Sequence, residues 1–240
     1  MTVALRLRLG LPIPRLAGSY LCQCQAPLDP FGHHSLTCRN GYHRSLRHDR
    51  IASTMRDMLR ALSHVARDTG LDGYLPLSAS GAKLVLDVYG SGGGPHAASV
   101  GIDVAVTHPC AASCVAAAAR EALGCAALRE GFKVGKHRPA CSTVGIQFVP
   151  AVFETFGSCG AQFEEWFRSQ VAWMSERVGD RDALGGFTAA TFSSWWQQRI
   201  SVALQLGNAR CIIERARRDQ PQGGVMEGHD DSQLAPCEVQ

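Results

Sequence analysis

Two aspartates, Asp87 and Asp103, each interrupt an apolar run in residues 83–107, KLVLDVYGSGGGPHAASVGIDVAVT. Val, Leu, Ile and Tyr dominate both runs and the Gly-rich residues 90–96 extend neither, so the pattern predicts a β-hairpin with one aspartate in each strand. A carboxylate inside a buried strand is costly to desolvate unless a partner compensates for it. Two carboxylates on paired strands are a candidate divalent-metal site, because hard cations prefer carboxylate oxygens. The alternative is that one or both aspartates face solvent on an edge.

A second set of chemically useful residues lies in residues 21–48, LCQCQAPLDPFGHHSLTCRNGYHRSLRH. Three sulfurs and one imidazole can form a tetrahedral zinc set here, from Cys22, Cys24, His34 and Cys38. The H-x3-C spacing is ordinary for a zinc knuckle, whereas C-x-C is tighter than the usual gap of two residues. A piece this short and rich in Pro and Gly can hardly bury a core of its own, which favours bound metal over free thiols. Three further histidines remain rival nitrogen ligands: His33, His43 and His48.

The composition limits the class of protein. The chain has 240 residues, of which 45% are hydrophobic, which is enough for one large domain or two small ones. The net charge is only +3, but residues 1–60 contain nine Arg, no Lys, three Asp and no Glu. A basic front end suits a partner that bears phosphate, although such a face is often merely solvated.

The sequence has no apolar run long enough to span a membrane and no secretory apolar core at its start, so an intracellular protein without membrane contact is expected. In that compartment the ten cysteines are not expected to form a disulfide framework. Some of them would then be metal ligands, and the rest small core residues.

Periodicity predicts the elements that position these residues. In chain order they are an extended arm at 1–20, an amphipathic helix at 45–69 ended by Gly70, the hairpin, an Ala-rich helix at 110–137 closed by Pro139, a strand at 144–153, helices at 161–178 and 188–218, and a disordered tail at 219–240. This order predicts an α/β or α+β fold with a mixed sheet. Cys110 and Cys114 are spaced as one helical face, which is more often a core feature than a pair of ligands. Lys133 and Lys136 lie three apart, so they would share one face.

Several segments together resemble one known protein region. They read CQC, DPFGHHSLTC, RHDRI, LDV, IDVAV, EGFKVGK, FVPAVFETFG and LGNARCIIERAR. In this order they are similar to the region that follows the reverse transcriptase in certain non-LTR retrotransposons, which has a zinc knuckle and a restriction-endonuclease-like domain of the PD-(D/E)xK type. The resemblance covers roughly residues 3–218. The knuckle, the RHD that opens a helix and the FVP…FETFG segment are its most specific parts.

The resemblance implies an α/β (α+β), restriction-endonuclease-like mixed-sheet core with an N-terminal zinc knuckle and C-terminal helices. The implied divisions are an arm at 1–20, the knuckle at 21–44, the endonuclease-like domain at 45–157, a helical region at 158–218 and a disordered tail at 219–240. The implied activity is magnesium-dependent hydrolysis of DNA phosphodiester bonds, as target-site nicking. DNA is the implied partner, with RNA of the parent element as a second one, and the implied location is the nucleus.

The resemblance also implies roles for individual residues. Cys22, Cys24, His34 and Cys38 would bind structural zinc, and Asp87 and Asp103 would hold catalytic magnesium. Lys133, from an E-x2-K-x2-K pattern that begins at Glu130, would lie near the attacking water or the scissile phosphate. Arg47 and His48 would face the DNA backbone or brace the fold, and Lys136 would contact nucleic acid.

The chain also departs from the family pattern. Leu86 stands where the family has proline, Ala105 stands where the lysine can follow the second acid, and His137 stands where an aromatic often follows the lysines. The helix at 45–69 offers no glutamate as a third acid, so Asp57 or Asp68 would have to substitute. Two other hypotheses therefore stand beside the nuclease: a catalytically inactive, zinc-stabilised nucleic-acid-binding remnant, and a structural remnant with neither function.

Overall fold

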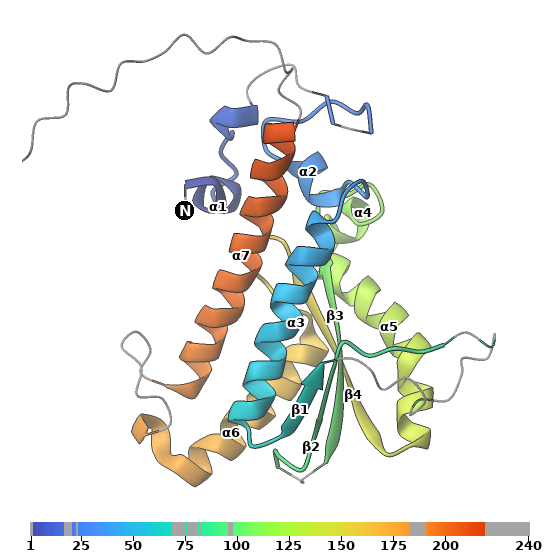
Figure 1. The fold of residues 1–240 in the computed structure, drawn as a ribbon, viewed down its shortest axis with the longest axis vertical. Coiled ribbons are helices and arrows are strands. Elements are labelled where there is room, and N and C mark those ends of the chain that lie inside the picture. The colour runs from blue at the N-terminus through green and yellow to red at the C-terminus, as the bar shows by residue number, and fades with distance from the viewer. Residues whose placement is uncertain are drawn as a thin grey trace, which may run out of the picture.

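The computed structural model describes residues 2–16, 21–22, 24–68, 75, 81, 83–95, 98–182 and 191–218. Figure 1 shows the arrangement of its elements. The helices are α1 (Thr2–Arg8), the 3-10 turn η1 (Pro14–Leu16), α2 (His33–Thr37), α3 (His43–Ala61), α4 (Val115–Ala118), α5 (Gly124–Thr143), α6 (Ala161–Asp182) and α7 (Phe192–Arg218). The strands are β1 (Val65–Asp68), β2 (Val88–Ser91), β3 (Ser99–Thr107) and β4 (Ile146–Glu154).

The four strands form one mixed sheet in the order β1-β2-β3-β4. β1 pairs with β2 and β2 with β3 in antiparallel fashion, whereas β3 and β4 are parallel. A parallel pair needs a crossover connection, and α5 lies in that connection. The predicted hairpin, the strand at 144–153 and the mixed α/β class are therefore confirmed. The first strand of the hairpin begins only at Val88, so the prediction that Asp87 lies inside it is wrong.

Helices cover both faces of the sheet. Alternate residues of β3, Val100, Ile102 and Val104, pack into the main core with α3, α6 and α7. Ala105, on the opposite face of β3, packs with Val152 of β4 and Ala126 of α5. Because side chains alternate along a strand, Asp103 lies on the α5 face of the sheet.

The two long helices α3 and α7 lie side by side (Figure 1). They approach closely at Gly207, where a Cβ atom would lie 2.6 Å from Cγ of Arg47. Arg47 is only 3% exposed, and its Nη1 donates a hydrogen bond to Oδ1 of Asn208 at 3.0 Å. The C-terminal part of α7 also packs with the N-terminal segment and the knuckle, through Leu7, Leu36 and Ile212.

Two predictions for the first 70 residues are wrong. Residues 2–8 of the expected extended arm form α1, which buries Leu7 and leaves Leu5 and Leu9 exposed. The helix expected at 45–69 ends at Ala61, and β1 follows at once as an edge strand that leaves Val65 exposed. Ser63, between the two elements, has φ of 63°, a left-handed conformation that breaks the helix.

The prediction for residues 110–137 is also corrected. Helix α4 spans only Val115–Ala118, with Cys110 before it and Cys114 as its N-cap residue, so the two cysteines do not form one helical face. Helix α5 then runs through Pro139 to Thr143 instead of stopping at Pro139. Helices α6 and α7 confirm the two predicted C-terminal helices over their described parts. Gly70, residues 188–190 and the tail at 219–240 lie outside the described residues.

Candidate acid site and zinc site

The two aspartates lie close together at the start of the hairpin. The paired register of β2 and β3 begins at Val88 and Ile102, and just before it the amide of Asp87 donates to the carbonyl of Ile102 at 2.9 Å. A hydrogen bond with the side chain of Asp87 is one of the contacts that lower the pKa of Asp103. Asp87 is half-buried just before β2, and Asp103 lies within β3 with 7% exposure. The two carboxylates therefore share one site.

Helix α5 places a cation on Asp103. Nζ of Lys133 lies 2.6 Å from Oδ2 of Asp103, and Nε2 of His137 lies 3.1 Å from the same oxygen. Both side chains are buried, and their i, i+4 spacing places them on one face of the helix. His137 differs from the aromatic residue of the family pattern. In the structure it lies within α5, which continues to Thr143, and it is a second partner of Asp103.

These contacts set the charges of the group. Burial raises the pKa of Asp103, but the hydrogen bond from His137 and the charge of Lys133 outweigh it and hold the pKa well below its usual range. Burial lowers the pKa of Lys133, and the Asp103 charge opposes this shift. Asp103 is thus a carboxylate at neutral pH, beside a lysine that has lost most of its solvation.

The N-terminal half of α3 contributes His48 to the site. Nε2 of His48 lies 3.0 Å from Oδ2 of Asp87, and the amide of Val104 donates to the same oxygen at 2.6 Å. The hydrogen bond from His48 to Asp87 raises the pKa of His48 to about 9, against an opposing effect of burial. His48 is therefore the residue that this helix contributes to the site, although the family pattern predicted a glutamate as a third acid there.

The acids considered as substitutes for that glutamate do not take its place. Asp57 lies in ion pairs with Arg60, at 3.8 Å, and with Arg199, at 3.4 Å. Arg199 belongs to α7, on the side of the sheet away from Asp103. The side chain of Asp68 lies outside the described residues.

A cleft of about 920 Å³ extends from the acid site toward the knuckle. Its lining includes Asp103 and Lys133 of the acid site, His108, and the exposed Arg39, Arg44 and Asp49. Further lining residues are the exposed Arg129 and the residues Arg47, His48 and Phe132. The cleft thus joins a carboxylate–lysine pair to a basic wall.

The predicted nucleic-acid contacts have different environments. Arg47 reaches the cleft lining but is buried between α3 and α7, so its contact to Asn208 braces the fold, one of its two expected roles. His48 contacts Asp87, as described above. Lys136 is exposed on α5, one turn beyond the buried Lys133.

The predicted zinc ligands converge. One ligand atom from each of Cys22, Cys24, His34 and Cys38 lies within 4.8 Å of all the others. Sγ of Cys38 is 3.7 Å from the sulfurs of both Cys22 and Cys24, and Nε2 of His34 is 3.3 Å from Sγ of Cys24. Sulfurs bound tetrahedrally to one zinc at about 2.3 Å would lie roughly 3.8 Å apart. The cluster can therefore bind a metal such as zinc, and His34 is its imidazole.

Asp29 positions the short helix α2 that carries His34. Its Oδ1 accepts hydrogen bonds from the amides of Phe31 and His33, at 3.0 and 2.9 Å, and its Oδ2 accepts one from the amide of His34 at 2.7 Å. Gly32 enters the helix with φ of 79°, and a Cβ there would lie 2.9 Å from Cδ1 of Ile212. The DPFGHH sequence is thus explained by a turn that presents two adjacent histidines.

Arg215 of α7 is a partner of the cluster that the sequence did not reveal. Its Nη1 lies 2.7 Å from Sγ of Cys22, and its Nη2 contacts the carbonyls of Cys38 and Asn40. Arg215 is buried, so its charge faces the sulfurs without screening by water. Burial raises the pKa of the Cys38 thiol, and the charge of Arg215 opposes this shift. Arg215 lies in the IIERAR segment, but nothing in that segment points to Cys22, which lies 193 residues away in the sequence.

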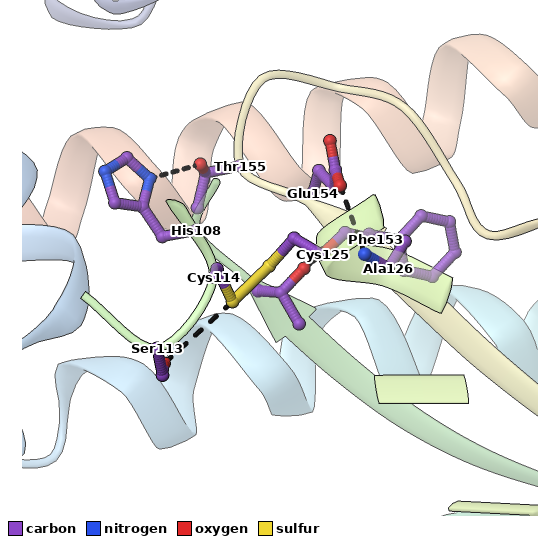
Figure 2. The surroundings of a disulfide bond; sticks show 9 residues. His108, Ser113, Cys114, Cys125, Ala126, Phe153, Glu154 and Thr155 are labelled. Carbon is purple, nitrogen blue, oxygen red and sulfur yellow. Dashed lines mark hydrogen bonds between the residues drawn. A yellow bond between two sulfur atoms is a disulfide. The ribbon is translucent and has the colours of Figure 1, made fainter. Parts of the chain in front are cut away.

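One pair of cysteines departs from the expectation that the chain forms no disulfides. Cys114 and Cys125 are joined by a disulfide across 11 residues, which ties α4 to the start of α5 (Figure 2). Close to it, the amide of Ala126 donates to Oε1 of Glu154, and His108 faces Thr155. Both cysteines line the cleft. The prediction that some cysteines are small core residues is confirmed for Cys141 and Cys211, which are buried.

Comparison of the chain with protein-family models and with curated proteins finds no match. No helix within the described ranges combines the length and the apolar character needed to cross a membrane.

Proposed function

We propose that this chain is a magnesium-dependent DNA endonuclease domain of the kind found downstream of the reverse transcriptase in non-LTR retrotransposons, and that it nicks DNA. The observation behind the proposal is the meeting of Asp87, just before β2, with Asp103 of β3 and Lys133 of the crossover helix, beside a cleft lined by exposed arginines. The three residues are in the order that the resemblance implies.

The acid pair fits a hard divalent cation. Both donors are carboxylates, and the hydrogen bonds and ion pairs described above use their Oδ2 atoms. Asp103 is ionised at neutral pH, as a magnesium ligand must be. When bound, magnesium would lower the pKa of a water molecule and stabilise the charge that develops on the phosphate.

The chain's own residues would do the remaining work. Lys133 is a fixed point charge beside the acid, able to orient the attacking water or the scissile phosphate. His48 fixes Asp87, and His137 fixes Asp103, so that neither carboxylate can rotate away from the site. Arg39, Arg44 and Arg129 line the cleft as exposed cations, suited to the phosphate backbone of DNA.

The test is nicking of supercoiled plasmid by the wild type and by Asp103→Ala, with and without magnesium. Magnesium should be omitted or replaced by calcium, because a chelator would also remove zinc from the knuckle. Asp57→Asn is the matched control, since this acid lies in ion pairs with Arg60 and Arg199 instead of at the site. We expect nicking to require magnesium, to be lost in Asp103→Ala and to persist in Asp57→Asn.

Zinc content and circular dichroism establish that each variant is folded. Magnesium-dependent nicking that survives in folded Asp103→Ala would remove this acid from the mechanism. Folded, zinc-loaded wild type that never nicks would overturn the nuclease proposal.

The second candidate is a zinc-stabilised nucleic-acid-binding module without catalysis. Leu86 in place of proline favours it, as does the close pairing of Lys133 with Asp103. Binding to DNA should then weaken steeply with salt, and Arg44→Ala and Arg129→Ala should reduce both affinity and salt dependence. The same assay with RNA identifies which nucleic acid is preferred.

A further inference from the structure

A second cluster of metal-ligand residues lies beside the knuckle. It consists of His33 from α2 and of His108 and Cys110 from the loop after β3, with one ligand atom from each within 4.8 Å of the others. Nδ1 of His33 lies 3.0 Å from Nε2 of His108. Two imidazoles bound to one zinc at about 2.0–2.1 Å have nitrogens roughly 3.3 Å apart, so this spacing is close to that of a metal pair.

The local structure prepares His33 for this position. Consecutive residues on a helix point about 100° apart, so the neighbours His33 and His34 cannot serve the same ion. His34 points to the knuckle cysteines, and His33 points to His108. The hydrogen bonds from the backbone of α2 to Asp29 hold both histidines in these directions.

His108 has an outer hydrogen-bond partner, as metal-bound histidines usually do. Its Nδ1 lies 2.7 Å from Oγ1 of Thr155 (Figure 2). This leaves Nε2 directed at His33. The carbonyl of Thr155 is in turn held by Asn208, which accepts a hydrogen bond from Arg47. Such outer hydrogen bonds fix the tautomer and the orientation of a metal-ligating ring. His108 is also buried, whereas Cys110 is exposed, so the third ligand faces solvent.

We propose that His33, His108 and Cys110 form a second zinc site that fastens the knuckle to the end of β3. Two imidazoles and one thiolate select zinc or a similar borderline cation over magnesium or calcium. With three protein ligands, the fourth position would be taken by water on the exposed side. This proposal is independent of the proposed nuclease activity, because it concerns how the two parts are joined.

A simpler explanation accounts for part of the cluster. The rings of Phe31, His33, His108 and Phe156 form a row with centroids 5.8, 5.1 and 5.5 Å apart, in which the first pair is stacked and the other two are tilted. In this explanation the two histidines merely share a hydrogen bond. That explanation gives no role to the sulfur of Cys110, which lies within reach of both rings. Zinc stoichiometry distinguishes the two.

The experiment measures zinc per chain, by elemental analysis, in full-length protein purified with zinc and then desalted. We expect about two zinc ions in the wild type and about one in Cys110→Ser, because only the knuckle would remain loaded. Cys159→Ser is the matched control, since Cys159 belongs to neither cluster of ligand residues in the described part of the chain, and it should keep about two. Circular dichroism shows whether each variant is folded.

A second variant and a spectrum complete the test. His33→Gln should also lose about one zinc ion, and the cobalt-substituted wild type should show more sulfur-to-cobalt absorption than Cys110→Ser. Wild type that holds about one zinc ion, or a folded Cys110→Ser that keeps the wild-type content and cobalt spectrum, overturns the second site and leaves the histidine hydrogen bond as the explanation.

Discussion

The knuckle and the acid site are built in opposite ways. The knuckle takes its four ligands from residues 22–38, and they converge into a closed set of sulfur and nitrogen donors. The acid site takes its groups from α3, β3, α5 and the residue before β2, and it opens onto a cleft. Closed sets with four protein ligands are typical of structural zinc, whereas chemistry needs an open position for substrate.

The two sites also differ in how charge is balanced. At the acid site each carboxylate already has a cationic partner, His48 for Asp87 and Lys133 for Asp103. At the knuckle, one buried cation from α7, Arg215, faces the sulfurs. The first arrangement holds both carboxylates in place and keeps Asp103 ionised, and the second attaches the knuckle cluster to the rest of the fold.

Removing a knuckle ligand should have the largest effect on stability. Cys38→Ser should lower the zinc content and the free energy of unfolding by several kcal/mol, because structural zinc contributes about 10–16 kcal/mol in isolated fingers. Denaturant unfolding, with zinc content as a parallel readout, measures this. Wild-type stability in a zinc-free Cys38→Ser variant would show that the knuckle is held by packing alone.

Substitutions of the two lysines of α5 should distinguish a role in the acid site from a general contribution of positive charge to DNA binding. Lys133→Met should reduce magnesium-dependent nicking by roughly 10²–10³-fold, the usual cost of losing one group that stabilises the transition state. Lys136→Met, on the exposed side, should change mainly the salt dependence of DNA binding. Plasmid nicking and binding titrations compare the two, and equal losses of nicking would argue against a special role for Lys133.

Replacing Arg215 should weaken zinc binding without touching a ligand. Arg215→Met keeps most of the side-chain volume but removes the contact to Cys22, and loss of such an outer partner usually costs about 10–100-fold in metal affinity. Competition with a chromogenic chelator measures the change. Nicking per zinc-loaded molecule should stay unchanged, and a selective loss of nicking would instead join Arg215 to the acid site.

Glu130→Gln should have the smallest effect and should appear only in the pH profile. Burial raises the pKa of Glu130, with an opposing hydrogen bond from the amide of Gln162. Because the folded-state pKa lies above the unfolded one, the stability that this glutamate contributes is present at low pH and is lost as pH rises through the folded pKa.

The variant should therefore gain stability relative to the wild type as pH rises to neutrality, by roughly 1 kcal/mol or less. Urea unfolding at pH 4 and at pH 7 measures the difference, and nicking should be unaffected. A large loss of nicking would instead give Glu130 a place in the reaction.

The sequence alone determined the features that rest on local pattern. Strand periodicity located the hairpin and Asp103 within its second strand, and short-range spacing favoured the four knuckle ligands while three rival histidines stayed open. The C-terminal helices also followed from their apolar period. The pattern failed where local signals conflict with packing, as at α1, at the edge strand β1 and at Pro139 within α5.

Only the tertiary structure decided which distant residues meet. His48 joins Asp87 across 39 residues, and Arg215 reaches Cys22 across 193. It also separated the neighbours His33 and His34 into two clusters, and it buried Arg47 against α7. Such contacts depend on how helices pack on the sheet, and the spacing of residues along the chain does not encode that packing.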